Sequence, residues 1–331
     1  MALYDIYGMG NALVDMEVEV TDTFLNENGI EKGVMTLVEQ DRQTQLLKVI
    51  QDLKHRRACG GSAANTMIAA AQLGGRVFYS CKVASDESGD FYYQDLLSNQ
   101  VQTNLTEKRA EGTTGKCLVM ITPDAQRTMN THLGITETFS TEELRLDSLQ
   151  KSQMLYVEGY LVTSPTGRAA AVEALTYARA HGVKTAMTFS DPAMAKYFRE
   201  PLKEMMGGGK LDLLFCNTEE AMTFTEKETF EEACIALRKY AHAFAITRSE
   251  EGALIFDGER EIEVRTHKVK AIDTNGAGDL FAGAFLWALS QDLGFAEAGR
   301  LACACSTQLV TQYGPRLKKE QIHQIREKVF E

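Results

Sequence analysis

Two aspartates frame a run of small residues near the C-terminus, Asp273-Thr-Asn-Gly-Ala-Gly-Asp279, and an apolar stretch follows it directly. Small residues at the start of a helix leave backbone N–H groups free, and the positive end of the helix dipole adds to their attraction for anions. We therefore expect the backbone of Gly276, Ala277 and Gly278 to form an anion hole for a phosphate group.

Asp279 falls three residues after Gly276, in the first turn of this predicted helix. A carboxylate at a phosphate site does not attract the phosphate, because like charges repel. It suits a general base that takes the proton from a hydroxyl group about to attack the phosphorus. An N-cap aspartate beside a glycine-eased turn is the alternative, but it explains one acid and one glycine rather than the whole run.

A second group of residues suits the hydroxyl groups of a sugar. Gly60-Gly-Ser-Ala-Ala-Asn65 opens an alanine-rich predicted helix, so that Gly60, Gly61 and Ser62 let a ligand approach the backbone. Asn11 and Asp15 flank the exit from the first predicted strand, where α/β sheets bind ligands. A carboxylate and two amides would bind hydroxyl groups. The alternative makes Asp15 a solvated turn residue and Asn65 a helix-surface residue.

Three further elements suggest a nucleotide site. Asn217 and Glu220 follow a buried strand and could lie near a hydrated Mg²⁺ ion, although an ordinary capped helix start has the same pattern. The segment Thr247-Arg-Ser-Glu-Glu-Gly252 ends a predicted strand with the hydroxyl groups of Thr247 and Ser249 and with Gly252, which suits a nucleotide phosphate. Arg127 offers a guanidinium group that could close over a phosphate.

Composition and motifs exclude several other classes of protein. The chain has 331 residues, 35 Lys and Arg against 46 Asp and Glu, and a net charge of −11, which argues against a nucleic-acid partner. No apolar run reaches the length of a membrane span, and no basic n-region marks a signal peptide. The seven cysteines form no metal-binding pattern and are expected to be reduced and buried, so we expect a cytoplasmic protein. There is no P-loop or protein-kinase motif, and Leu13 breaks a dinucleotide fingerprint that begins at Gly8.

The elements that must position these residues alternate between strands and helices in the second half of the chain. Strands are predicted at 153–158, 183–189, 211–216 and 243–247, and helices at 165–181, 193–206, near 219 and at 230–240. The C-terminal third is predicted to be helical at 277–290, 295–312 and 318–329. This alternation predicts βαβ units and a mainly parallel, buried sheet.

The N-terminal third follows a different pattern. Met16 to Val20 alternates apolar and acidic residues, as a strand with one wet face would. Further strands are predicted at 34–38, 116–122 and 127–133, and helices of the α/β body at 60–73 and 89–99. The sequence therefore predicts a small, partly exposed β-sheet appended to the α/β body.

Together the three motifs resemble those of the ribokinase-like (pfkB-type) kinases of sugars and nucleosides. Asp273 to Asp279 is similar to the C-terminal signature of that family, Gly60 to Asn65 to its N-terminal signature, and Asn217 to Glu220 to its magnesium and phosphate motif. The resemblance implies one catalytic domain over 1–331, a three-layer α/β/α sandwich with a mainly parallel central sheet and a β lid formed by about 14–40 and 107–135. It also implies ATP and Mg²⁺, and leaves open a monovalent cation such as K⁺ near Asp273.

Within the family, four segments are most similar to those of adenosine kinases: 7–15, 114–118, 213–221 and 272–279. This likeness implies Asp279 as the base, Gly276 to Gly278 as the anion hole, and adenosine as the acceptor, with products AMP and ADP. Residues expected to bind the acceptor are Asn11, Asp15, Gly60, Gly61, Ser62, Asn65, Leu37 and Tyr160. Residues expected near the nucleotide and Mg²⁺ are Asn217, Glu220, Thr247, Ser249, Gly252 and Thr274, with Arg127 at the transferring phosphoryl group.

Three departures from the family pattern keep alternatives open. Met35 stands where a polar lid residue is expected, and Ser249 replaces the glycine of the Thr-x-Gly nucleotide motif. The C-terminal stretch from Ala302-Cys-Ala-Cys-Ser306 to Gly314-Pro-Arg316 differs from that of the animal adenosine kinases. A sugar kinase for ribose or fructose therefore remains an alternative, as does a non-catalytic nucleoside or nucleotide sensor. The sequence allows either a monomer or a homodimer.

Overall fold

The computed structural model describes residues 2–106, 109–124 and 126–331, and within these ranges nine strands form the central sheet. Their order is β14-β13-β12-β11-β10-β9-β1-β5-β6, with parallel pairing throughout except where β13 and β14 join antiparallel. The strands are β1 (Tyr4–Met9), β5 (Val77–Ser80), β6 (Gln102–Thr103), β9 (Ser152–Val157), β10 (Lys184–Thr188), β11 (Leu211–Asn217), β12 (Ala241–Thr247), β13 (Ala253–Phe256) and β14 (Glu261–Val264). The mainly parallel sheet predicted from the sequence is confirmed.

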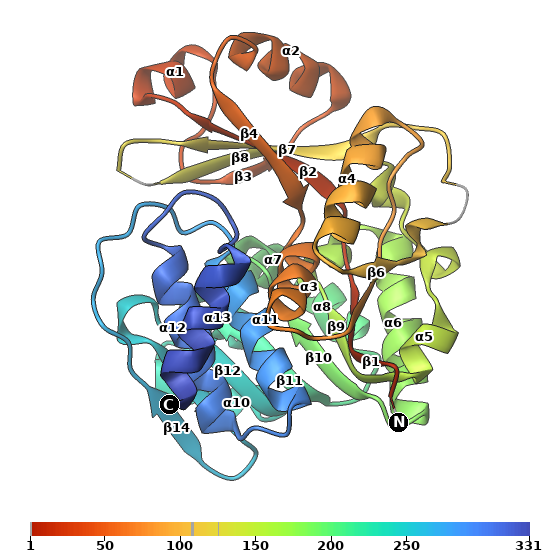
Figure 1. Cartoon of the computed structure of the whole chain (residues 1–331), viewed down its shortest axis with the longest axis vertical. Coiled ribbons are helices and arrows are strands. Elements are labelled where there is room, and N and C mark those ends of the chain that lie inside the picture. The colour runs from red at the N-terminus through yellow and green to blue at the C-terminus, as the bar shows by residue number, and fades with distance from the viewer. Residues whose placement is uncertain (1, 107–108, 125) are drawn as a thin grey trace.

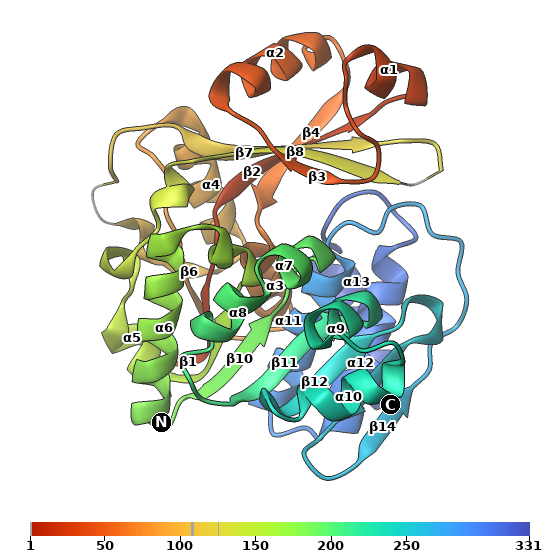
Figure 2. The same cartoon turned by 180° about the vertical axis from the view of Figure 1, so that it is seen from behind.

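Helices cover both faces of this sheet, as Figures 1 and 2 show from opposite sides. One layer holds α3 (Ser62–Gln72), α4 (Glu87–Ser98), α11 (Ala277–Ser290), α12 (Phe295–Leu309) and α13 (Lys319–Phe330). The other holds α5 (Leu146–Gln150), α6 (Pro165–Ala180), α7 (Pro192–Tyr197), α8 (Arg199–Met205), α9 (Thr218–Thr225) and α10 (Phe230–Leu237). The three-layer sandwich is therefore confirmed, although two short helices replace the single helix predicted at 193–206.

A second sheet lies above one edge of the sandwich (Figure 1). Within the described residues it has five strands in the order β3-β8-β7-β2-β4: β2 (Leu13–Glu19), β3 (Met35–Leu37), β4 (His55–Gly60), β7 (Thr114–Ile121) and β8 (Arg127–Gly134). Its outer face packs under α1 (Asp22–Glu27) and α2 (Gln40–Ile50). The predicted lid segments 14–40 and 107–135 lacked β4, and their residues 107–108 and 125 lie outside the described ranges.

The predicted wet face of β2 was wrong at Glu17, although Glu19 at the end of the strand is exposed. Asp15 is only 7% exposed and Glu17 only 8%, while Val18 on the opposite face packs beneath α1 and α2. The acidic face turns toward the α/β body instead of toward water, and alternation along a strand does not reveal what covers its polar side. Asp15 accordingly lies within a strand of the second sheet, whereas Asn11 does follow the end of β1.

The packing of α11 against α3 brings together residues more than two hundred positions apart. A Cβ atom at Gly283 of α11 would lie 2.4 Å from the carbonyl oxygen of Thr66 in α3. Only glycine permits this approach. As a result, the first turn of α11, which carries Asp279, lies beside the first turn of α3, which carries Ser62 and Asn65.

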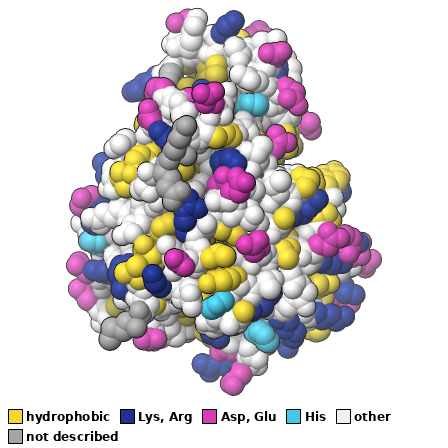
Figure 3. Space-filling model, turned by 90° about the vertical axis from the view of Figure 1, so that its right-hand side faces the viewer, with side chains coloured by type: hydrophobic (Ala, Val, Ile, Leu, Met, Phe, Trp, Pro, Cys, Tyr) yellow, Lys and Arg dark blue, Asp and Glu magenta, His cyan; other side chains and the backbone are white. Residues whose placement is uncertain are grey.

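Surface and cysteine chemistry agree with the composition. All seven cysteines are buried and free, as predicted. Acidic and basic side chains are interspersed over the face shown in Figure 3, without a continuous basic stripe. Among the described residues, none of the helices has the length and apolarity needed to cross a bilayer.

Candidate active site

A cavity of about 810 Å³ lies between the second sheet and the carboxyl ends of the central strands, which is the usual ligand site in α/β sheets and a ligand-sized volume. It brings together nearly all the predicted site residues. Those that line it are Asn11, Asp15, Leu37, Gly61, Ser62, Asn65, Arg127, Tyr160, Asn217, Glu220, Thr247, Ser249, Gly252, Thr274, Gly276, Ala277, Gly278 and Asp279. Gly60 and Asp273 stand behind this lining and support it.

Gly276, Ala277 and Gly278, the predicted nest at the start of α11, line the cavity, and the N–H of Ala277 also donates to the carbonyl oxygen of Thr274 at 3.3 Å. Gly276 is the N-cap with a φ of 71°, and a Cβ atom there would lie 2.5 Å from the carbonyl oxygen of Pro315, so no larger residue fits. Asp273 is fully buried, and its two oxygens accept the N–H groups of Asn275, at 2.8 Å, and Gly314, at 2.9 Å. Asp273 therefore shapes the loop that leads into the nest.

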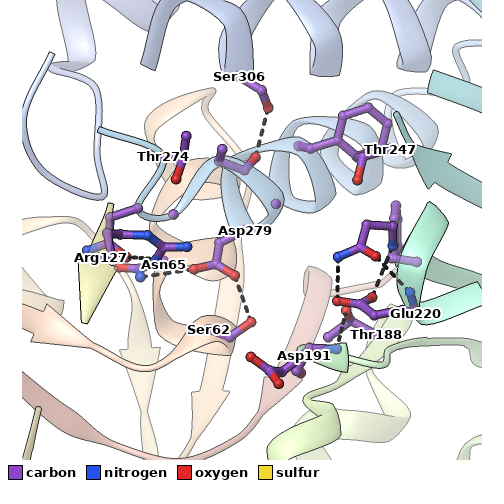
Figure 4. Close-up of a pocket in the computed structure, with 18 of the residues that line it drawn as sticks. Ser62, Asn65, Arg127, Thr188, Asp191, Glu220, Thr247, Thr274, Asp279 and Ser306 are labelled. Carbon is purple, nitrogen blue, oxygen red and sulfur yellow. Dashed lines mark hydrogen bonds between the residues drawn. The ribbon is translucent and has the colours of Figure 1, made fainter. Parts of the chain in front are cut away.

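Asp279 points into the cavity from the first turn of α11, as Figure 4 shows. One carboxylate oxygen accepts a hydrogen bond from Ser62 Oγ at 2.7 Å, and the other accepts one from Asn65 Nδ2 at 3.1 Å. Burial raises the pKa of Asp279, while these two hydrogen bonds and the charges of Arg127 and Arg316 act against the rise. A carboxyl group held in this way, with a raised pKa, is suited to accept a proton.

Asp15 faces the same cavity from β2. Among the described residues its carboxylate accepts no hydrogen bond from a protein donor, and a Cβ atom at Gly60 would lie only 1.9 Å from its Oδ1. Burial and the neighbouring Glu17 raise its pKa to about 8. An unpartnered carboxylate in a cavity calls for donors from a ligand, and Gly60 makes the room in which it stands.

Asn65 is engaged by protein groups on both sides, which the sequence did not predict. Its Nδ2 donates to Asp279, and its Oδ1 accepts from Nε of Arg316 at 3.2 Å. Arg316 also donates to Asp95 Oδ2 at 2.9 Å and to the carbonyl oxygen of Cys59. No short motif marks Arg316, because its partners lie in three elements that are distant in sequence.

Two more carboxylates line the floor of the cavity. Asn217 and Glu220 form a reciprocal capping box at the start of α9, so the alternative of a capped helix start is present, but both side chains also reach the cavity. Glu158, missed by the sequence analysis, accepts the N–H groups of Asn11 at 3.2 Å and Ala63 at 2.8 Å. Burial raises the pKa of both Glu220 and Glu158 to about 8. A charged residue directly after the buried strand β9 was the available signal for Glu158.

The segment after β12 has the backbone form that the glycine of the Thr-x-Gly motif would adopt. Ser249 has a φ of 51°, in the left-handed region that favours glycine. The cavity also receives Thr247, at the end of β12, and Gly252. Ser249 thus holds a backbone conformation that a glycine would adopt at a lower cost.

The second sheet touches the nest through one amide side chain. Arg127 donates to Asn275 Oδ1 at 2.9 Å, and Asn275 Nδ2 donates to Glu17 Oε1 at 3.1 Å. Arg127 lies on β8 and Glu17 on β2, so two strands of the sheet contact the loop that begins α11. Neither Glu17 nor Asn275 was predicted as a site residue.

The remaining wall on the side of the second sheet is mainly apolar. Its members are Leu13, Met35, Leu37, Cys117, Val119, Met129 and Leu133, with the polar Thr131 among them. Tyr160 lies across the cavity and donates to Asp191 Oδ2 at 3.4 Å. A ligand that fills this cavity therefore meets polar groups at the nest and Asp15, and apolar groups along the sheet.

Comparison with known proteins agrees with this geometry. A sequence profile described as pfkB family carbohydrate kinase matches residues 38–322. The chain belongs to the pfkB family. As a member of this kinase family it is a phosphotransferase that acts on a hydroxyl group, with ATP as co-substrate and typically a divalent metal ion.

Several relatives match between 70% and 100% of the chain. The crystal structure of adenosine kinase from Sinorhizobium meliloti is similar with a TM-score of 0.91 and 34% identity, covering 99% of this chain and 100% of that one. A probable sugar kinase from Rhizobium etli CFN 42 has a TM-score of 0.91 and 31% identity, covering 100% and 98%. Mouse ribokinase is 29% identical over 239 residues, which are 70% of this chain and 71% of that protein. Adenosine kinases and sugar kinases thus both stand among the relatives.

Proposed function

We propose that this pfkB kinase transfers the γ-phosphoryl group of ATP to the 5′-hydroxyl of adenosine and gives AMP and ADP. The observation that carries the proposal is the arrangement of one cavity: a held carboxylate, Asp279, beside an anion nest, with the unpartnered Asp15 and an apolar wall opposite. A nucleoside has the matching chemistry, with a primary hydroxyl, a pair of ribose hydroxyls and a flat, largely apolar base. A free sugar has no group for the apolar wall.

In the proposed mechanism Asp279 takes the proton of the 5′-hydroxyl while the 5′-oxygen attacks the γ-phosphorus of ATP. The bond between the γ-phosphorus and the β,γ-bridging oxygen breaks. ADP leaves, and the proton remains on Asp279 until solvent or product removes it. The N–H groups of Gly276 to Gly278 bind the charge that develops on the phosphoryl oxygens. Arg127, which donates a hydrogen bond to Asn275 in this structure, would move to reach the same phosphoryl oxygens.

Asp15 would accept hydrogen bonds from the ribose hydroxyls, next to the backbone at Gly61 and to Asn11. Leu37 and Tyr160 would cover the base, with Met35 and Met129 on the same wall. These contacts orient the 5′-hydroxyl toward Asp279, and positioning of this kind supplies much of the catalysis in phosphoryl transfer.

The nucleotide would lie along the other end of the cavity, on Thr247, Ser249, Gly252 and Thr274. Mg²⁺ commonly uses phosphates and water with only one or two protein groups, here Asn217 and Glu220. The ion would neutralise charge on the β- and γ-phosphates. K⁺ near Asp273 stays a proposal without a defined ligand set.

We further propose that the chain is one catalytic domain, 1–331, whose second sheet acts as a lid over the acceptor and excludes water from the reaction. The contacts from Arg127 and Glu17 to Asn275 support this role, because they connect the sheet to the phosphate nest.

A sugar kinase is the second candidate, and the 31% identity to a probable sugar kinase over the whole chain favours it. An acceptor screen at fixed MgATP distinguishes the two. Purified protein is assayed for ADP release with adenosine, other nucleosides, ribose and fructose, and Asp279→Asn serves as the blank. We expect kcat/KM for adenosine to exceed that for either sugar by at least about tenfold, the loss caused by one missing favourable contact of about 1.4 kcal/mol.

If the protein prefers ribose or fructose, adenosine is not its acceptor, but the protein is still a kinase. No ADP release above the blank with any acceptor would favour the non-catalytic sensor.

A further inference from the structure

Arg316 lies in the C-terminal segment that leads into α13, and its side chain is only 15% exposed. It reaches three separate elements: Asn65 in α3, Asp95 in α4 and the carbonyl oxygen of Cys59 in β4. We propose that Arg316 is a positioning residue that fixes the amide of Asn65 so that it donates to the base Asp279. The proposal rests on Asp279 being the base, as given above.

The guanidinium of Arg316, the amide of Asn65 and the carboxylate of Asp279 follow one another in a line, and their chemistry fixes the orientation of the amide. A guanidinium group only donates hydrogen bonds, and a carboxylate only accepts them. Asn65, which lies between the two, can satisfy both only with Oδ1 toward Arg316 and Nδ2 toward Asp279, and this is the orientation found, at 3.2 Å and 3.1 Å. Without Arg316 the amide oxygen of Asn65 would lose this donor, and the amide would no longer be held from that side against Asp279.

Arg316 is itself held at a fixed distance from the nest. Two residues earlier, the N–H of Gly314 donates to Asp273 at 2.9 Å, and the carbonyl of Pro315 lies against Gly276. At its far end the guanidinium pairs with Asp95 at 2.9 Å. Backbone and side chain therefore anchor Arg316 from opposite sides, which leaves its Nε with one direction in which to donate.

The consequence for Asp279 is a carboxylate whose two oxygens are both oriented. Ser62 holds one oxygen and the chain from Arg316 through Asn65 holds the other. The remaining lone pairs are then aimed into the cavity, where the acceptor hydroxyl would bind. A displacement of about 1 Å at such a position can reduce a rate by about a hundredfold.

We call the connection from Arg316 through Asn65 to Asp279 the relay, and a double-mutant cycle tests it. The cycle compares Arg316→Met, Asn65→Ala and the double variant, with kcat measured on the acceptor that the wild type prefers. We expect Arg316→Met to lower kcat by about 10- to 100-fold with little change in the KM for ATP. In the Asn65→Ala background the same change should lower kcat by less than about threefold, because the intermediate group is already missing. If Arg316→Met does not fold, the cycle uses Arg316→Gln, whose shorter side chain keeps a donor for Asp95.

Arg326→Met is the matched control. Arg326 lies in α13, which follows the segment that holds Arg316, and it contacts the opposite end of α3, where it donates to the carbonyl oxygen of the C-cap Leu73 at 3.0 Å. It should lower the melting temperature without a comparable loss of kcat. Equal losses from Arg326→Met and Arg316→Met would make Arg316 a stabilising residue only and overturn the relay.

Two further results would overturn it: an unchanged kcat in Arg316→Met, or a loss that is fully additive with Asn65→Ala. A crystal structure of Arg316→Met gives a readout without turnover, in which Asn65 should leave Asp279. If the wild type phosphorylates no acceptor, the proposed function fails, and an unmoved Asn65 in that crystal structure would still refute the relay.

Discussion

The cavity has two sides that are built in different ways. On the α/β side, the nest at Gly276 and the base Asp279 belong to one helix start, and their arrangement follows from seven consecutive residues. On the side of the second sheet, Asp15 and Glu17 stand on β2 and Arg127 stands on β8, and the sheet reaches the body through contacts such as Arg127 to Asn275, 148 residues apart. The first side is fixed by local backbone geometry. The second depends on sheet pairing and on a few hydrogen bonds that a motion of the lid could break.

The largest expected effect concerns the locally built side. Asp279→Asn keeps the size of the side chain and a hydrogen-bond acceptor for Ser62, but it removes the base. General-base catalysis contributes about 10²- to 10⁴-fold, so kcat should fall by that factor while the KM of the acceptor changes far less. Steady-state assays with the preferred acceptor measure both constants.

Asp279→Glu is the companion variant, because it keeps the charge and shifts the carboxylate by one methylene. It should be weak but more active than Asp279→Asn. If Asp279→Asn kept more than about a tenth of the wild-type kcat, Asp279 would not be the base, and the local motif would serve only to bind phosphate.

On the lid side, Asp15→Ala should act mainly on acceptor recognition. Hydrogen bonds to a charged group contribute about 1.5 to 3 kcal/mol, so above about pH 8, where Asp15 is ionised, kcat/KM should fall by roughly 10- to 100-fold. Gly60→Ala should give a loss of the same kind without any change in charge, because the new Cβ would lie 1.9 Å from Oδ1 of Asp15 and displace it.

A deoxyribonucleoside that lacks the contacted hydroxyl supplies the control for Asp15. It should be a poor substrate of the wild type, yet its kcat/KM should fall little further with Asp15→Ala, because the hydrogen bond between Asp15 and that hydroxyl is already missing. Full additivity of the two deletions would remove Asp15 from the acceptor site.

The two sides also differ in how far the sequence could predict them. The helix 277–290 was predicted with its observed bounds, because a glycine N-cap and an apolar run are local signals. The role of Asp15 was expected from its type and from the family resemblance, but its place inside β2 was not. The burial of Glu17 was missed as well, since alternation along β2 indicates two faces but not which of them meets the body.

The contacts missed on both sides share one cause. Arg316 and Asn65 are 251 residues apart, and Asn275 and Glu17 are 258 apart. Such pairs follow from the packing of whole elements, and no spacing rule within one segment reports them. β4 and the antiparallel strands β13 and β14 were missed for a related reason, because short strands depend on their partners more than on their own residues.

Arg127 tests whether the lid side joins in catalysis. Arg127→Ala removes one charged donor while the backbone N–H groups of the nest remain, so we expect a fall in kcat of about tenfold, at the lower end for a charged hydrogen bond. The KM of the acceptor should change little. Hydrogen exchange should slow together in 13–19 and 114–121 when acceptor and nucleotide bind, because β2 and β7 pair in one sheet.

Normal turnover in Arg127→Ala, with protection confined to the α/β body, would show that the second sheet does not close over the reaction. Lys116→Ala is a suitable control: its residue is on β7 of the same sheet, outside the cavity lining, and should leave kcat unchanged.

The smallest expected effect concerns Glu17, where lid and nest meet. Burial raises the pKa of Glu17, as does the charge of Asp273, while the hydrogen bond from Asn275 and the charges of Arg56 and Arg316 lower it. Because the folded-state pKa lies above the unfolded value, the carboxyl favours the fold most below about pH 4.5, its ordinary pKa, and this contribution is lost as pH rises through the raised pKa.

Glu17→Gln keeps an acceptor for Asn275 without the charge, so its stability relative to the wild type should increase from acid to neutral pH. Thermal unfolding across this range should show a gain of about 1 kcal/mol or less, roughly 2 °C at this chain length, with kcat nearly unchanged. A variant that instead loses stability as pH rises would mean that the ionised Glu17, and not a neutral hydrogen bond through Asn275, holds the second sheet to the phosphate nest.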